Sequence, residues 1–260
     1  RKECTVDETF FAGVKIEKIQ LSTGVRIELP VRYYDWSAIM AHFPAPAAKV
    51  QELLPTDRLK PAQLVPGTAV VSMVAMEYRH IADIELYNEF GIMVPVLYEP
   101  AVNLPALPLL FPHWFKRFGF YVHHLPVTTQ EAYDFGVEIW GYPKIVGEIS
   151  FDDVGEMRRC RLRSKGKDIA TLEVRKLDTK ARYMNFHSYT VKNGQLLRTL
   201  IQTQGQYGIA RFSGGASYTL GEHPIAEELR AIGMGERAVE CLYAPQVKSM
   251  LYRASENLAL

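Results

Sequence analysis

Most apolar positions in the chain follow the two-residue period of β-strands. Residues 160–163 and 170–175 alternate apolar and charged side chains on either side of a turn at Gly166, which predicts a hairpin with one solvated face. Residues 70–78 and 86–98 are rich in Val, Ile, Met and Tyr and lack a helical period, so they are predicted to be buried strands. The pattern indicates a mainly β protein.

Helical patterns are few and short. Three stretches begin with a proline and space their apolar residues three or four positions apart: 46–54, 224–232 and 245–254. The sequence contains no internal repeat, no linker and no low-complexity tract. We therefore expect a single domain over residues 1–260, of a β-rich α+β class, with a few helices at the periphery of the strands.

Composition and charge narrow the class of partner. Hydrophobic residues make up 48% and charged residues 23% of the 260 positions, which is typical of a globular protein. Thirty Lys and Arg against 29 Asp and Glu leave a net charge of +1. Such a balance provides no global field for a polyanion, so neither nucleic acid nor a membrane is expected as a partner.

The cysteines and the most apolar segment favour a cytoplasmic protein. Cys4, Cys160 and Cys241 form no CxxC pair, which argues against a disulfide scaffold and fits a reducing compartment. The first residues, Arg-Lys-Glu-Cys, do not resemble a secretory signal. Residues 91–115 contain five prolines, which exclude a membrane-spanning helix there. Because residues 95–112 are too apolar for a solvated loop, we expect them to cover a pocket or contact another subunit.

The common signatures of phosphate, zinc and serine-hydrolase sites are absent from the sequence, which has no GxxxxGK[ST], no GxGxxG after a strand, no HExxH and no GxSxG. The seven histidines are scattered. His123 and His124 are adjacent, and neighbouring residues on a strand point to opposite faces, so one metal ion is not expected to take both. No metal site is predicted.

A lysine in an apolar, aromatic segment is the candidate for chemistry. Within residues 136–149, Lys144 directly follows a proline and lies close to Trp140 and Tyr142. Loss of hydration disfavours an ammonium group, which lowers the pKa of a lysine and leaves a free amine near neutral pH. A free amine is the nucleophile that forms a Schiff base with a carbonyl substrate. On this local pattern, a solvated lysine in a proline-containing turn is the alternative.

The segment resembles the signature of the acetoacetate decarboxylase family, in which a Gly-x-Glu stretch leads into an aromatic residue, a proline and the Schiff-base lysine. The matching positions are Gly136, Glu138, Tyr142, Pro143 and Lys144. The family enzyme is itself a standard example of a lysine activated by desolvation or by a neighbouring cation. The resemblance spans most of the chain and implies a mostly antiparallel closed β-barrel around a ligand cavity, and a homo-oligomer.

The resemblance also implies the other site residues. Residues 86–96 are similar to the family strand that carries a pocket glutamate, and Glu89 takes that place. The family's pocket arginine falls near Asp35 or Trp36, and Arg32 is the nearest cation and the candidate to bind a substrate carboxylate. Three aromatic side chains are expected to bind substrate and form a dry wall beside the lysine: Tyr87, Trp140 and Tyr142.

The expected activity is that of a carbon-carbon lyase without a metal or organic cofactor. A small β-keto acid such as acetoacetate would form an imine with Lys144 and lose carbon dioxide to give acetone, with Glu89 as the acid or base. The chain departs from the family in having Ile145 where the family has a second lysine, so burial alone would have to lower the pKa of Lys144.

Two alternatives stay open. A Schiff-base aldolase or dehydratase acting on a pyruvate-like keto acid would use the same imine, and the missing second lysine gives this alternative weight. A non-catalytic barrel that binds a small ligand would hold Lys144 as a buried, paired lysine.

Overall fold

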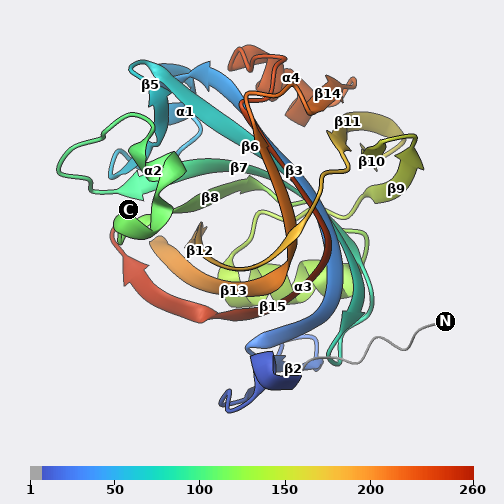
Figure 1. The fold of residues 1–260 in the computed structure, drawn as a ribbon. Coiled ribbons are helices and arrows are strands. Elements are labelled where there is room, and N and C mark those ends of the chain that lie inside the picture. The colour runs from blue at the N-terminus through green and yellow to red at the C-terminus, as the bar shows by residue number, and fades with distance from the viewer. Residues whose placement is uncertain (1–7) are drawn as a thin grey trace.

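The computed structural model describes residues 8–260, whose strands form a closed seven-stranded β-barrel with a smaller sheet beside it (Figure 1). In order around the barrel, the strands are β7 (Asn88–Tyr98), β8 (Phe118–His124), β12 (Lys180–Lys192), β13 (Gln195–Arg211), β15 (Glu240–Leu258), β3 (Val31–Pro46) and β6 (Thr68–Ile81). The pairing of β6 with β7 closes the ring. Within the described residues these pairs are antiparallel except β8 with β12. The mainly β, mostly antiparallel closed barrel expected from the sequence is confirmed.

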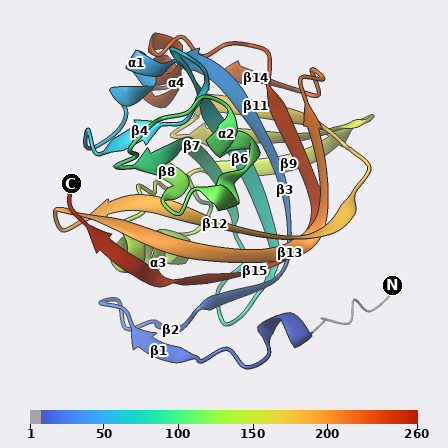
Figure 2. The same cartoon turned by 60° about the vertical axis from the view of Figure 1, so that its left-hand side comes forward.

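Smaller elements surround the barrel (Figure 2). The second sheet has the strand order β14 (Ala216–Leu220), β11 (Lys167–Arg175), β10 (Met157–Ser164) and β9 (Glu148–Val154). The remaining strands are β1 (Glu17–Gln20) and β2 (Arg26–Leu29), which form a hairpin, β4 (Leu59–Pro61) beside β7, and β5 (Gln63–Val65) beside β6. The helices are α1 (Ala47–Gln51), α2 (Leu107–Leu110), α3 (Gln130–Trp140) and α4 (Pro224–Ala231), with short 3-10 turns at Glu8–Phe11 and Pro112–Trp114.

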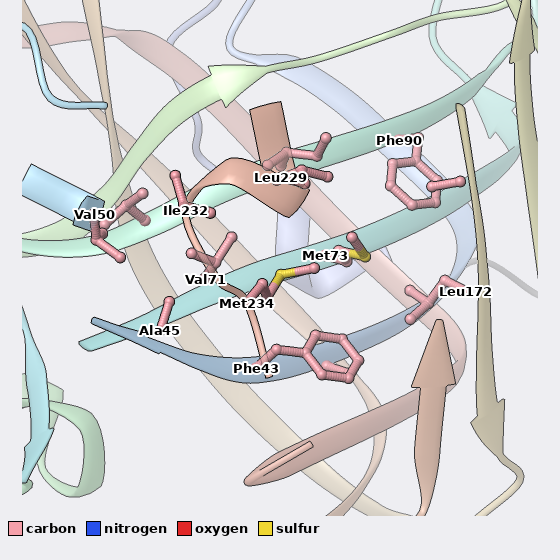
Figure 3. Close-up of a cluster of buried hydrophobic side chains, with 14 of the residues drawn as sticks. Phe43, Ala45, Val50, Val71, Met73, Phe90, Leu172, Leu229, Ile232 and Met234 are labelled. Carbon is pink, nitrogen blue, oxygen red and sulfur yellow. The ribbon is translucent and has the colours of Figure 1, made fainter. Parts of the chain in front are cut away.

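The barrel strands are apolar on both faces, because the outer face packs against other elements and the inner face lines a cavity. This explains their long apolar runs. On the outer face, Phe43, Val71 and Met73 of β3 and β6 pack against Leu172 of the small sheet and Leu229 of α4 (Figure 3). Side chains at the intervening positions of the same strands face the barrel interior and line a cavity. Each fully buried side chain of this kind contributes about 1.5–3 kcal/mol.

Most of the predicted elements are present. The hairpin is formed by β10 and β11, and the two apolar runs are β6 and β7. The helix predicted at 224–232 is α4, while the one predicted at 46–54 is the shorter α1. Helix α3, which precedes Lys144, was not predicted.

The helix predicted at 245–254 is wrong, because these residues belong to β15 and pair with both β13 and β3. The pairing of β15 with β3 shifts register between Ala244 and Val247 and again between Val247 and Ser249. Irregularities of this kind interrupt the two-residue alternation of a strand. Buried residues such as Val247, Met250 and Leu251 then fall three and four positions apart, which imitates a helical period.

A bulge also overturns the prediction that His123 and His124 point to opposite faces. On β7, the neighbours Ile92 and Met93 pair with His124 and Val122, which leaves His123 as an extra residue of β8. A bulge of this type turns two neighbouring side chains toward one side of a sheet. The imidazole rings of the two histidines lie 4.4 Å apart.

The proline-rich segment contacts the cavity, in agreement with the expectation that it covers a pocket. Leu109, Leu110 and Pro112 line the cavity, whereas Val102 and Trp114 expose most of their side chains. A contact with another subunit through the exposed residues stays a prediction.

None of the helices in residues 8–260 has both the length and the hydrophobicity needed to cross a membrane. Cys160 and Cys241 are free and buried, while Cys4 and the Arg-Lys-Glu-Cys start lie outside the described residues.

Candidate active site

The end of helix α3 positions Lys144. Thr129 caps the start of α3 by accepting a hydrogen bond from the Ala132 N–H at 3.2 Å. The helix ends at Gly141, whose φ of 66° lies in the left-handed region that favours glycine. The chain then reverses through Pro143, and the Lys144 side chain runs back along the helix, where its Nζ donates to the Ala132 carbonyl at 3.0 Å.

The Lys144 ammonium group is buried beside a carboxylate. Its Nζ lies 3.0 Å from Oε2 of Glu89, the second residue of β7. The lysine side chain is 2% exposed and the glutamate side chain 9%. The rings of Phe135 and Tyr87 lie 4.9 and 5.4 Å from Nζ, within the range of cation–π contacts. The aromatic surroundings replace water around the amine.

Burial lowers the pKa of Lys144 below that of an ordinary lysine, because the charged form loses its hydration. The Glu89 carboxylate opposes this effect by stabilising the ammonium group. Within the described residues, Glu89 is the charged side chain that contributes to the shift. This chain has Ile145 at the position of the second lysine in the family pattern. Desolvation, and not a neighbouring cation, therefore lowers the pKa of Lys144.

We expect Lys144 to react with an amine reagent at a lower pH than the lysine of a short unstructured peptide in the same solution. Acetic anhydride labelling followed by mass spectrometry across a pH series would measure this. Removing the opposing carboxylate with Glu89→Gln should move the Lys144 titration to a still lower pH, because the ammonium form loses its partner. A Lys144 that titrates together with the peptide lysine would contradict the proposed desolvation.

Tyrosine hydroxyls surround this pair of charged groups. Four tyrosines line this part of the cavity: Tyr33, Tyr78, Tyr87 and Tyr142. The Tyr78 hydroxyl donates to Oε1 of Glu89 at 3.2 Å, and the hydroxyls of Tyr33 and Tyr87 lie 3.0 Å apart. Burial raises the pKa of all four phenols, so they stay protonated and are able to donate to a substrate oxygen.

The pair opens into a cavity of about 890 Å³ inside the barrel. Its lining is mainly apolar and includes four methionines, Met40, Met76, Met93 and Met184. Methionine side chains are flexible and fill irregular space. Residues 182–188 also line the cavity, since β12 pairs with β8 only at Ser188 and Tyr189 in the described chain and is not paired with it before that point. The volume is near the upper end of the range for small-molecule pockets, about 300–1,000 Å³.

Four of the six predicted site residues line the cavity: Lys144, Glu89, Tyr87 and Tyr142. Trp140 does not, because it is the fully buried last residue of α3, and its Nε1 donates to the Tyr252 carbonyl at 2.7 Å. Its ring packs 6.1 Å from that of Phe135 and 5.8 Å from that of Tyr142. Trp140 therefore supports the aromatic wall from behind.

Arg32 lies outside the cavity. It precedes Tyr33 on β3, and neighbouring residues of a strand face opposite sides, so the tyrosine faces inward and the arginine outward. The Arg32 guanidinium forms an ion pair with Glu28. The sequence prediction placed a cation near the correct strand but on the wrong face.

Trp36, Tyr33 and Tyr78 are among the cavity residues that sequence reasoning missed. Trp36 lines the cavity near the position of the family's pocket arginine, and its buried Nε1 has no hydrogen-bond partner. Strand alternation from Tyr33 would not have located it, because the pairing of β3 shifts register between Asp35 and Trp36. Tyr78 could have been suspected, because it is the one aromatic residue of the predicted strand 70–78.

Comparison with known proteins identifies related sequences and folds. A sequence model of the acetoacetate decarboxylase (ADC) family matches residues 20–252. No curated protein sequence matches the chain. The acetoacetate decarboxylase of Legionella pneumophila subsp. pneumophila str. Philadelphia 1 has a similar structure, with a TM-score of 0.60, 15% identity, and coverage of 88% of this chain and 87% of that chain.

Two further structures share the fold. An acetoacetate decarboxylase-like enzyme from Sphingomonas wittichii RW1 has a TM-score of 0.53 and 14% identity, and covers 90% of this chain and 94% of its own. The enduracididine biosynthesis enzyme MppR, complexed with the condensation product of pyruvate and imidazole 4-carboxaldehyde, has a TM-score of 0.60 and 11% identity, with coverage of 95% and 98%. At these identities the structural similarity defines the fold alone.

Proposed function

The chain belongs to the acetoacetate decarboxylase family, and from that premise we propose that it is an enzyme in which Lys144 forms a Schiff base with a keto-acid substrate. One observation carries the proposal: the Lys144 Nζ is buried 3.0 Å from Glu89 at the wall of a large apolar cavity. An amine with a lowered pKa is a nucleophile, and a carboxylate within hydrogen-bond distance is able to accept its proton.

Decarboxylation of a β-keto acid is the proposed reaction. Glu89 takes a proton from the Lys144 ammonium group, the free amine attacks the ketone carbon, and water leaves to give a protonated imine. The bond to the carboxylate breaks, carbon dioxide departs, and the imine nitrogen accepts the released electron pair as an enamine. Glu89, which gives its first proton to the departing water and takes another from solvent, delivers that second proton to the carbon, and water hydrolyses the imine to release the ketone and the amine.

The apolar wall assists this sequence in two ways. It keeps the amine of Lys144 poorly hydrated, and it excludes water from the enamine until a proton arrives from Glu89. The neutral hydroxyls of Tyr33 and Tyr87 and the unpartnered Trp36 Nε1 are donors for the substrate oxygens.

A second candidate is an aldol condensation or dehydration of a pyruvate-like keto acid. It is favoured because Glu89 is the charged side chain, among the described residues, that shifts the pKa of Lys144, so the family's second lysine has no counterpart beside the amine. MppR, which shares the fold, is complexed with the condensation product of pyruvate and an aldehyde. In this reaction the enamine would attack an aldehyde carbon.

The cavity volume favours a keto acid larger than acetoacetate. A four-carbon acid would leave most of the 890 Å³ to water, and water weakens the electrostatic interactions of an active site. A substituent on the far side of the ketone would extend along the methionine-lined interior and displace that water. We therefore propose a β-keto acid with a bulky apolar substituent.

Trapping of the imine with borohydride tests the proposal. The protein is incubated separately with acetoacetate, pyruvate and a 3-oxo acid with a longer alkyl chain, reduced, and analysed by peptide mass spectrometry. We expect an adduct on Lys144, and release of carbon dioxide faster from the longer 3-oxo acid than from acetoacetate. An adduct without carbon dioxide, together with an aldol product when an aldehyde is added, would establish the second candidate. Absence of any adduct would leave a ligand-binding barrel.

A further inference from the structure

Two histidines and a glutamate converge on the outside of the barrel. Oε2 of Glu228 on α4 lies 3.0 Å from Nε2 of His123 and 2.7 Å from Nε2 of His124, both on β8. One potential ligand atom from each residue lies within 4.8 Å of the others. Glu228 is 104 positions from His124 in the sequence, so it is the fold that brings the helix residue and the two histidines together.

The bulge in β8 creates this arrangement. Val122 and Leu125 both face the cavity, three positions apart, and the two histidines between them face outward toward α4. The helix is anchored against the barrel and the small sheet by Ile225 and Leu229, which are buried in the outer core. Apolar packing therefore fixes the distance between the helix and the histidines. The contacts among the three polar side chains are a consequence of that packing.

The spacing fits the coordination shell of a transition metal. In a tetrahedral zinc site with ligand distances of about 2.0–2.2 Å, neighbouring ligand atoms lie about 3.3–3.6 Å apart. The observed distances of 3.0 and 2.7 Å from the Glu228 oxygen need to open by less than an ångström. Nε2 of His123 is buried and lies 3.0 Å from the Glu228 carboxylate without the alignment of a hydrogen bond, so the carboxylate contacts it by charge and proximity alone.

The ligand chemistry narrows the class of ion. Imidazole nitrogens select zinc, copper, iron or nickel, while magnesium and calcium prefer oxygen. The side chains of His123, His124 and Glu228 are 14%, 25% and 37% exposed, so an ion is able to enter from solvent and retain a water as a fourth ligand. Two histidines and one carboxylate are also a known ligand set for zinc.

We propose that His123, His124 and Glu228 bind one zinc ion, or a similar transition-metal ion, which links α4 to the barrel wall. The site is separate from the Lys144 cavity, because β8 turns its other face inward at this point. The ion would stabilise the packing of α4 and would take no part in imine formation, so this proposal does not depend on the proposed function.

Binding of Zn²⁺ to the chelator-treated full chain tests the proposal. We expect one zinc per chain by calorimetric titration and metal analysis, and a rise in Tm of about 5–10 °C when zinc is about 100-fold above its Kd. Magnesium at the same concentration should produce no shift.

Single substitutions then identify the ligands. His123→Gln, His124→Gln and Glu228→Gln should each weaken zinc binding at least about tenfold and remove most of the rise in Tm. His80→Gln is the matched control, because this exposed histidine lies on β6 away from the cluster, and it should leave zinc binding unchanged.

Two results of the zinc-binding measurements would overturn the proposed site. A wild-type chain that binds no zinc, or that binds it equally well in all three ligand variants, would overturn the proposal and leave the cluster as a hydrogen-bonded contact. If one variant is unfolded before zinc is added, the other two still provide the comparison.

Discussion

A Lys144→Gln variant is expected to lose at least about 10⁴-fold in kcat and to form no borohydride-trapped adduct. Glutamine has no amine that attacks a ketone, so the covalent intermediate cannot form at this position. The loss should appear with any keto acid that the wild-type protein converts, because imine formation precedes both decarboxylation and aldol condensation. Turnover measurements with the preferred substrate and mass spectrometry of the reduced protein provide the two readouts.

The control must separate lost chemistry from lost stability. Removing Lys144 leaves the Glu89 carboxylate 9% exposed without its ion-pair partner, and breaking one half of a buried pair typically costs about 3–5 kcal/mol. The double variant Lys144→Gln with Glu89→Gln removes both charges and should recover most of that stability while staying inactive. Turnover retained in the folded single variant would rule out Lys144 as the Schiff-base residue.

The resemblance predicted Lys144, Glu89 and two aromatic side chains beside the lysine, Tyr87 and Tyr142, whereas the contact between the two charged groups could not be predicted from the sequence. Lys144 and Glu89 are 55 positions apart, and a local pattern contains no information on whether they meet. Their contact depends on β7 entering the barrel wall and on α3 ending at Gly141, which turns Lys144 back toward Ala132. The burial of the lysine, and hence the direction of its pKa shift, follows from that geometry.

The errors share a physical cause, which is that a strand has two faces and that bulges exchange them. Arg32 was assigned to the site, and its neighbour Tyr33 lines the cavity instead. The bulge in β8 brings His123 and His124 to one side, and register shifts in β15 imitate a helix. Alternation read from the sequence predicts which residues share a face only until the first irregularity of the strand.

A Gly136→Ala variant is expected to fold and to lose about 100-fold or more in kcat/KM. A Cβ atom at residue 136 would lie 2.3 Å from Cε and 2.8 Å from Nζ of Lys144, well inside contact distance. The obstructing atoms form the end of a flexible side chain, so the lysine would move while the backbone stays in place. Displacement of a reacting group by about 1 Å costs on the order of 100-fold in rate.

The stability of this variant should fall little or not at all, which makes the loss of activity specific. Alanine is about 1 kcal/mol more favourable than glycine in a helix interior, and that gain offsets part of the crowding. Gly155→Ala, in the turn between β9 and β10, is the matched control, because its added methyl group contacts nothing within 4 Å and lies far from the cavity in the fold. It should keep full kcat/KM, with a small loss of Tm because its φ of 57° disfavours alanine.

Full activity in Gly136→Ala would mean that the path of Lys144 along α3 is not needed for turnover. Loss of activity with an unchanged or higher Tm would explain physically why the segment carries a glycine at this position: it leaves room for the lysine.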